Sequence, residues 1–132
     1  MKATLFTDGG ARGNPGPAGI GYVITPKGKP PVTHGEYIGT ATNNQAEYKA
    51  LIDGLAHAKK LGVADLDCFL DSELVVKQIR GQYRVKNEDL KPLYQQVLAL
   101  KESFSTISFA HIPRSKNAAA DALVNKALDA RK

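Results

Sequence analysis

The sequence contains one cysteine, one methionine and no tryptophan in 132 residues. A single cysteine excludes an intramolecular disulfide and any zinc site built from several cysteines. No apolar run approaches the roughly 18–20 residues that a membrane-spanning helix needs. The first acid, Asp8, also comes too early for the apolar stretch of a signal peptide. These absences favour a cytoplasmic protein with no membrane partner.

The charge balance is mildly basic. Eighteen Lys and Arg against thirteen Asp and Glu give a net charge of +5, and 42% of the residues are hydrophobic. This composition is typical of a folded domain with a substantial core, so we expect a single domain over residues 1–132. One acid-free window, residues 77–86, holds Lys77, Arg80, Arg84 and Lys86. It is either an ordinary solvated helix end and loop or a surface that binds phosphates.

The spacing of apolar residues predicts an α/β fold. Strands are expected at residues 2–7, 19–24, 32–40, 66–70 and 107–112. Helices are expected from Asn43, as N-cap, to a last turn at Lys59 and Lys60, and at residues 73–80, 89–104 and 117–130. The order β-β-β-α-β-α-α-β-α predicts a mixed sheet flanked by helices, since crossover connections make the later strands parallel to the first.

Two carboxylates follow predicted strands. Asp8 closes the first strand, directly before Gly9 and Gly10, and Asp71 closes the fourth strand, directly before a helix N-cap. If these strands are parallel neighbours, both side chains emerge at the carboxyl-end edge of the sheet. That edge is where open α/β sheets bind their ligands.

Two further carboxylates begin the apolar stripe of a helix. Glu47 is followed at helical spacing by Ala50, Leu51, Gly54 and Leu55, and Asp121 by Val124 and Leu128. A carboxylate on such a face needs a partner. Because four clustered carboxylates raise one another's pKa, hard divalent cations suit them best. Two Mg²⁺ ions, with Mn²⁺ as an alternative, could activate water and neutralise the leaving oxygen in phosphodiester cleavage.

Each acid also has an ordinary explanation. Asp8 could be a turn residue and Asp71 an acid favoured by a helix dipole. Glu47 and Asp121 would be solvent-exposed if the helical phase were slightly different. The metal hypothesis therefore depends on all four acids converging on one centre.

Four segments that carry these acids resemble the signature blocks of type 1 ribonuclease H. The segments are Thr7–Gly10 with Gly13–Pro17, Thr42–Glu47, Asp71–Glu73 and Asn117–Asp121. They occur in the family's order, and the resemblance covers essentially the whole chain. It implies a ribonuclease H-like fold, a five-stranded mixed sheet flanked by helices on both faces. It also implies an endonuclease that hydrolyses the RNA strand of RNA–DNA hybrids, leaving 3′-hydroxyl and 5′-phosphate ends.

The resemblance also implies roles for individual residues. Asp8, Glu47, Asp71 and Asp121 match the four metal-binding catalytic acids, which hold two Mg²⁺ ions when substrate is bound. Hybrid contacts in the minor groove are implied for Asn14, Asn43, Asn44 and Gln45, and a DNA phosphate contact for Thr42. The backbone around Gly10 can approach the nucleic acid closely. The implied partner is an RNA–DNA hybrid, recognised through its 2′-hydroxyls, and we expect a monomer.

The sequence departs from the family in two places. Many bacterial members carry a loop histidine before the last catalytic acid. Aligned from the strand end, its place is taken by Arg114; counted back from Asp121, by His111. We favour Arg114, which cannot act as a base and would act through its charge. The long basic protrusion with tryptophans is absent, so weaker substrate affinity is expected unless the basic window of residues 77–86 partly replaces it.

Three alternatives remain at this stage. One is a catalytically silent module that binds hybrids on the same fold. Another is a different nuclease or transferase of the same topology, such as an integrase-like or phosphatase-like enzyme. The third is a domain of a reverse transcriptase or a two-domain ribonuclease. The presence of all four acids and of the Thr42–Glu47 block favours the ribonuclease H, while Met1 and a last helix that nearly reaches Lys132 predict a freestanding chain.

Overall fold

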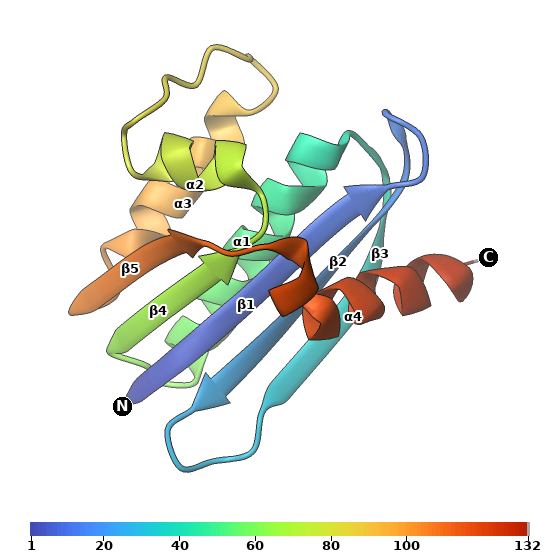
Figure 1. The fold of residues 1–132 in the computed structure, drawn as a ribbon. Coiled ribbons are helices and arrows are strands. Elements are labelled where there is room, and N and C mark those ends of the chain that lie inside the picture. The colour runs from blue at the N-terminus through green and yellow to red at the C-terminus, as the bar shows by residue number, and fades with distance from the viewer. Residues whose placement is uncertain (132) are drawn as a thin grey trace.

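The computed structural model describes residues 1–131. Its centre is one five-stranded sheet in the order β3-β2-β1-β4-β5 (Figure 1). The strands are β1 (Lys2–Ala11), β2 (Gly16–Pro26), β3 (Val32–Ala41), β4 (Asp65–Leu70) and β5 (Thr106–His111). The pairs β1–β2 and β2–β3 are antiparallel, whereas β1–β4 and β4–β5 are parallel. The predicted mixed sheet is confirmed.

Helices cover both faces of the sheet (Figure 1). They are α1 (Asn43–Lys60), α2 (Glu73–Ile79), α3 (Lys91–Lys101) and α4 (Ala118–Asp129), with a short 3₁₀ helix, η1 (Arg114–Lys116), before α4. The helix α1 packs on β1 and β2 with α3 beside it, and α4 packs on β1, β2 and β3. No helix within residues 1–131 is long and apolar enough to cross a membrane.

The third helix is shorter than the sequence predicts. Residues 89 and 90 belong to a turn in which the Asn87 side chain accepts a hydrogen bond from the Asp89 N–H at 2.8 Å. The helix then begins at Lys91, with Pro92 in its first turn, and ends at Lys101. This turn explains why α3 begins two residues later than predicted. The Asn87 side chain already accepts the Asp89 N–H, a backbone group that an earlier helix start would use.

The main core lies between the sheet and α1. Leu51 and Leu55 of α1 are fully buried, as is Leu5 of β1. Gly54 permits this contact, since a Cβ there would lie 2.9 Å from a Leu5 methyl carbon. Cys68 is buried in the same core, and burial raises the pKa of its thiol. It is therefore a small hydrophobic core residue and not a nucleophile.

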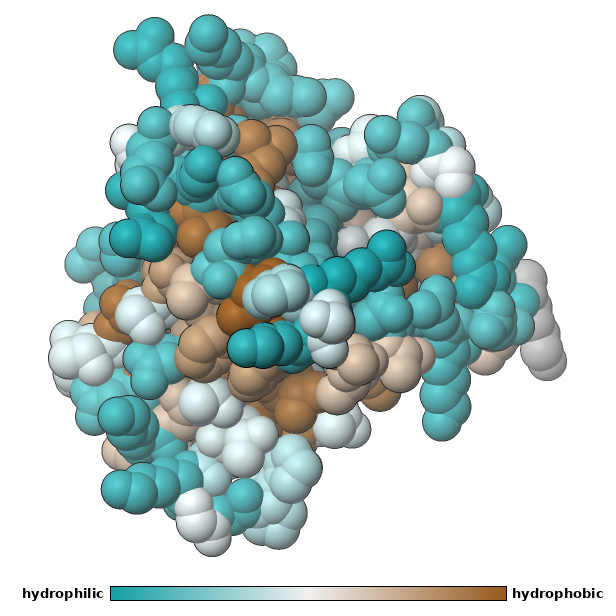
Figure 2. Space-filling view, in the orientation of Figure 1, coloured by the Kyte–Doolittle hydropathy of each residue, from teal (hydrophilic) through white to brown (hydrophobic). Residues whose placement is uncertain are grey.

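The opposite face of the sheet brings α4 unusually close to the strands. A Cβ on Gly21 of β2 would lie 2.6 Å from the carbonyl oxygen of Ala120. This contact fixes how close the first turn of α4, which carries Asp121, lies to the sheet. Beside α4, the same face exposes part of the stacked rings of Phe6 and Phe69, 4.8 Å apart, and Figure 2 shows hydrophobic side chains in the middle of this face.

Candidate active site

Asp8 and Asp71 lie next to each other at the end of β4, where β1 continues beyond it. The last parallel pair is Thr7 with Leu70, and Asp8 and Asp71 each follow it by one residue. Asp8 was predicted to close its strand, and this was wrong: β1 runs on to Ala11 because β2 still pairs with it there. The prediction that Asp8 and Asp71 lie at the same edge of the sheet is nevertheless confirmed, because Asp8 is the first residue of β1 beyond its pairing with β4.

Glu47 reaches this edge from the second turn of α1. Thr42 is the N-cap of α1, one residue earlier than the predicted Asn43. Its hydroxyl accepts a hydrogen bond from the Gln45 N–H at 3.1 Å, and the Gln45 side chain accepts one from the Thr42 N–H at 2.8 Å. This capping box satisfies two backbone donors at once, an arrangement that Asn43 as N-cap would not allow.

A glycine lets α1 and β1 touch at this point. A Cβ on Gly9 would lie 2.6 Å from the backbone nitrogen of Glu47, so no other residue fits without displacing the helix. The Gly9 N–H in turn donates a hydrogen bond to Glu47 Oε1 at 2.6 Å. The glycine after Asp8 therefore both admits Glu47 and orients its carboxylate.

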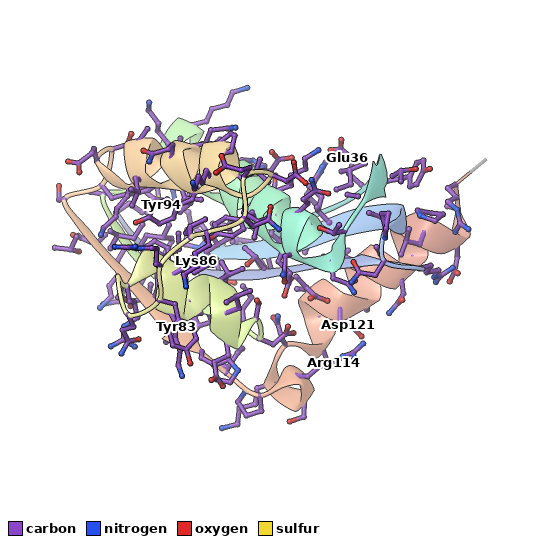
Figure 3. The ribbon with its side chains drawn as sticks, turned by 90° about the horizontal axis from the view of Figure 1, so that it is seen from above. Glu36, Tyr83, Lys86, Tyr94, Arg114 and Asp121 are labelled. Carbon is purple, nitrogen blue, oxygen red and sulfur yellow. The ribbon has the colours of Figure 1, made fainter. Side chains whose placement is uncertain are left out.

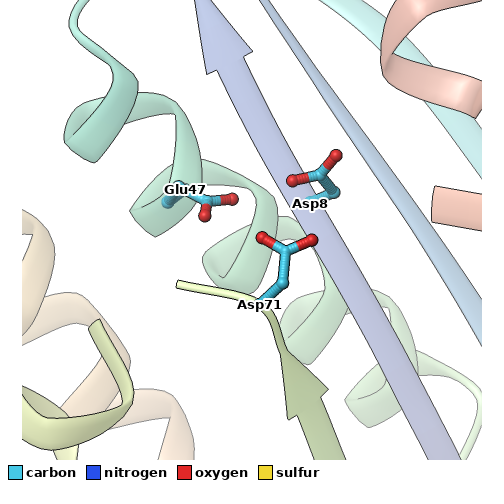
Figure 4. Close-up of side chains that lie close together, drawn as sticks. All are labelled: Asp8, Glu47 and Asp71. Atoms are coloured by element: carbon cyan, nitrogen blue, oxygen red, sulfur yellow. The ribbon is translucent and has the colours of Figure 1, made fainter. Parts of the chain in front are cut away.

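Asp8, Glu47 and Asp71 form one cluster (Figure 4). Each offers a carboxylate oxygen, and these atoms all lie within 4.8 Å of one another. Burial, together with the carboxylates of Asp71 and Asp121, raises the pKa of Asp8 to about 7. Burial and the neighbouring Asp8 also raise the pKa of Glu47 well above its usual value. Three hard oxygen donors that resist joint ionisation fit a divalent cation such as Mg²⁺.

Asp121 faces the cluster from α4. It lines the same pocket, of about 420 Å³, and lies near enough to Asp8 to raise the pKa of that carboxyl. It is not part of the group of oxygens within 4.8 Å of one another. Its own carboxylate accepts hydrogen bonds of 3.4 Å from Arg114 and from Asn125. The structure thus brings three predicted acids together and places the fourth, on α4, beside Asp8 but outside that group.

Arg114 and His111, the two alternatives for the family's loop histidine, lie in different places. Arg114 belongs to η1 and lines the pocket, with its Nη2 atom 3.4 Å from Asp121 Oδ1 (Figure 3). His111 is the exposed last residue of β5, where it lies near Glu73. Of the two, Arg114 is the side chain that can act on a group bound in the pocket.

The residues predicted to contact substrate surround the start of α1. Asn43 Oδ1 accepts a hydrogen bond from the Ala11 N–H at 2.8 Å, and Asn14 Oδ1 accepts one from the Asn43 N–H at 3.1 Å. These bonds tie the loop of residues 12–15 to the helix. Gly10, Asn43 and Asn44 line the pocket, whereas Asn14, Thr42 and Gln45 flank it without lining it.

Three pocket neighbours had no predicted role. Arg12 lines the pocket while its Nη1 atom lies 2.7 Å from Asp129 Oδ1, and Asn125 bonds to Asp121. Asn117 donates a hydrogen bond to Asp71 Oδ2 at 3.0 Å. Two signals were available in the sequence: Asn117 begins the Asn117–Asp121 segment that resembles the family, and Asn117 and Asn125 each lie four residues from Asp121, one helical turn on either side.

Comparisons with known proteins agree with this geometry. A family model described as "Reverse transcriptase-like" matches residues 6–127. A bifunctional protein of Mycobacterium tuberculosis is 46% identical over 98% of this chain, although the match spans 36% of that relative's own length.

Two solved structures match over nearly their whole length. The RNase H1 of Halobacterium salinarum is 41% identical, with a TM-score of 0.95 over 99% of this chain and 100% of that chain. LC11-RNase H1 in complex with an RNA/DNA hybrid is 44% identical, with a TM-score of 0.90 over 96% of both chains. With the sheet order and the acid cluster already in place, these matches confirm that the chain belongs to the type 1 ribonuclease H family.

Proposed function

We propose that residues 1–132 form a single ribonuclease H domain that acts as a cytoplasmic monomer and hydrolyses the RNA strand of RNA–DNA hybrids. The products would carry 3′-hydroxyl and 5′-phosphate ends. The observation that carries the proposal is the cluster of Asp8, Glu47 and Asp71, whose oxygens lie within 4.8 Å of one another. A relative of 44% identity that was solved with an RNA/DNA hybrid supports the choice of substrate.

The acids would hold divalent cations during the reaction. Asp8, Glu47, Asp71 and Asp121 are the proposed ligands, and two Mg²⁺ ions, or Mn²⁺ in their place, would activate water and neutralise the leaving oxygen. The Gly9 N–H keeps the Glu47 carboxylate turned toward Asp8. Arg114, whose side chain is 79% exposed beside Asp121, supplies a positive charge that can hold a phosphate at the pocket mouth.

The N-terminal end of α1 would bind the hybrid. The first turn of α1 contains no acid, and Thr42 begins it, so the positive end of the helix dipole is free to attract a DNA phosphate. Beside it, Asn14, Asn43, Asn44 and Gln45 would face the minor groove, and Gly10 would let the backbone approach the RNA strand. The hydrogen bonds of Asn14 and Asn43 order this surface before substrate arrives.

Strand-specific cleavage tests the proposal directly. A hybrid, a DNA duplex and an RNA duplex of one sequence are labelled on each strand in turn and incubated with Mg²⁺ or with a chelator. We expect cleavage of the RNA strand of the hybrid alone, and none in chelator. Chelator-resistant cleavage, or cutting of the DNA strand, would contradict the assignment. Tight binding of the hybrid without cleavage would instead identify a silent binding module.

The basic window of residues 77–86 is expected to add to hybrid affinity. Lys77 lies over the ring of Tyr83, with its Nζ atom 4.9 Å from the ring centroid, and Arg84 and Lys86 are exposed in the following loop. Figure 3 labels Tyr83 and Lys86 in this segment. The double variant Arg84→Ala/Lys86→Ala should weaken hybrid binding severalfold at low salt. It should also reduce the slope of log affinity against log salt by about one for each lost phosphate contact, with kcat unchanged.

A pair of lysines at the far end of the sheet provides the control. Lys27 and Lys29 are exposed in the turn between β2 and β3, so Lys27→Ala/Lys29→Ala makes the same change in net charge. Filter binding over a series of salt concentrations measures both variants. Equal losses of affinity in the two would show that overall charge, and not the window of residues 77–86, contributes the effect.

A further inference from the structure

Asn117 connects segments that are far apart in the chain. It is 1% exposed, and its Nδ2 atom donates hydrogen bonds to the Thr7 carbonyl oxygen at 2.8 Å and to Asp71 Oδ2 at 3.0 Å. Its partners lie 110 and 46 residues away in the sequence. Its own carbonyl oxygen accepts the Asp121 N–H at 3.1 Å. One residue therefore contacts Asp71, the residue before Asp8, and the backbone of Asp121.

The chemistry of these bonds fixes the orientation of the amide. Both partners, a backbone carbonyl and a carboxylate, are acceptors, so only the NH₂ group of Asn117 can face them. Each of its two hydrogens serves one partner. Asn117 occupies the N-cap position of α4 but makes no side-chain cap bond there. Its side chain is therefore committed to β1 and Asp71 and not to starting the helix.

We infer that Asn117 is a positioning residue that holds the Asp71 carboxylate in the orientation that accepts a divalent cation. Through its bond to Thr7, it also fixes the distance between β1 and the start of α4. The inference rests on the function proposed above. In a cluster of acids that repel one another, a neutral donor 3.0 Å from Asp71 Oδ2 restrains the rotation of that carboxylate. Hydrogen bonds to metal ligands typically change metal affinity or activity by about 10–100-fold when they are lost.

The variant Asn117→Ser tests this role while keeping a favourable N-cap residue before α4. Serine is a favourable N-cap residue, so α4 can still begin, but its short hydroxyl side chain does not reproduce the two bonds of the amide. Titration calorimetry with Mn²⁺ alone should show affinity at least tenfold below that of the unaltered protein. With hybrid substrate, kcat should fall while KM for the hybrid stays the same, since Asn117 is buried away from the surface that binds the duplex.

Gln78 supplies a matched control. It is another buried amide, 5% exposed, and its Oε1 atom accepts a hydrogen bond from the Tyr48 hydroxyl at 2.6 Å, outside the residues that line the pocket. Gln78→Met should lower the melting temperature without changing Mn²⁺ affinity. Unchanged Mn²⁺ affinity in Asn117→Ser, or an equal loss in both variants, would overturn the inference.

A measurement on the unaltered protein completes the test. The side-chain amide signal of Asn117 in ¹⁵N-resolved NMR spectra should move as Mg²⁺ is added, while that of Gln78 should not. An Asn117 signal that stays in place while Mg²⁺ binds would overturn the inference even if Asn117→Ser failed to fold. A protein that binds neither Mg²⁺ nor Mn²⁺ would refute the proposed function itself, which is a different outcome.

Discussion

Asp8→Asn is expected to abolish cleavage of the RNA strand and, in chelator, to make the protein more stable. Asp8 is 7% exposed, and burial with the neighbouring carboxylates raises its pKa to about 7. Its charged form is therefore unfavourable in the folded protein without a cation, and a neutral amide of the same shape removes that cost. Because the pKa of Asp8 rises from 3.8 to about 7, the gain in the free energy of unfolding at pH 8 should be on the order of 4 kcal/mol.

The two effects have separate measurements. Chemical denaturation in chelator gives the free energy of unfolding, and the strand-labelled hybrid gives the rate. Filter binding in chelator should show hybrid affinity close to that of the unaltered protein, since Asp8 lies at the base of the pocket. Asp71→Asn should likewise abolish cleavage, because it removes another oxygen donor from the cluster.

An acid on the same sheet provides the control. Asp67 of β4 accepts a hydrogen bond from the Ser108 hydroxyl at 2.7 Å and does not line the pocket. Asp67→Asn should leave the cleavage rate unchanged. If Asp8→Asn cut at the rate of the unaltered protein, the metal-binding role of Asp8 would be wrong. If it were less stable in chelator, the electrostatic account of the cluster would be wrong.

The sequence predicted the site because strand order can be inferred from local patterns. Crossover connections make β4 parallel to β1, and parallel neighbours place the residues after them at one edge, which brings Asp8 to Asp71. Helical phase placed Glu47 on the inward face of α1. The sequence could not predict the distance between α4 and the sheet. The contact of Gly21 with Ala120 sets this distance, and the position of Asp121 depends on it.

Two local errors have a shared physical cause. Thr42, Asn43 and Asn44 can all cap a helix, and the choice of Thr42 depends on a reciprocal bond with Gln45. Asp8 was placed at a strand end because Gly9 and Gly10 suggested a turn, whereas pairing with β2 keeps the strand extended. In both places an interaction partner selects one of several conformations that the local sequence allows. The partner is the nearby Gln45 for the N-cap and the strand β2 for the backbone after Asp8. The role of Asn117 was missed for the same reason, because Thr7 is 110 residues away.

The pH dependence of stability should reverse sign when a divalent cation is added. In chelator, the folded protein holds a proton on Asp8 up to about pH 7, whereas the unfolded chain releases it near the ordinary value of 3.8. The proton therefore stabilises the fold below about pH 4, and this contribution is lost as the pH rises to about 7. Glu47, whose pKa is also raised, acts in the same direction.

The difference between Asp8→Asn and the unaltered protein isolates this effect from all other titrating groups. In chelator, the stability advantage of the variant should be small near pH 4, grow as the pH rises to about 7, and stay level above that. With saturating Mg²⁺ the order should invert, because the cation binds only deprotonated carboxylates and displaces the proton from Asp8. Denaturant titrations at several pH values, with and without Mg²⁺, measure all four curves. An advantage that did not change with pH in chelator would mean that Asp8 is already ionised at pH 4, and the cluster would then lack the electrostatic reason to bind a cation.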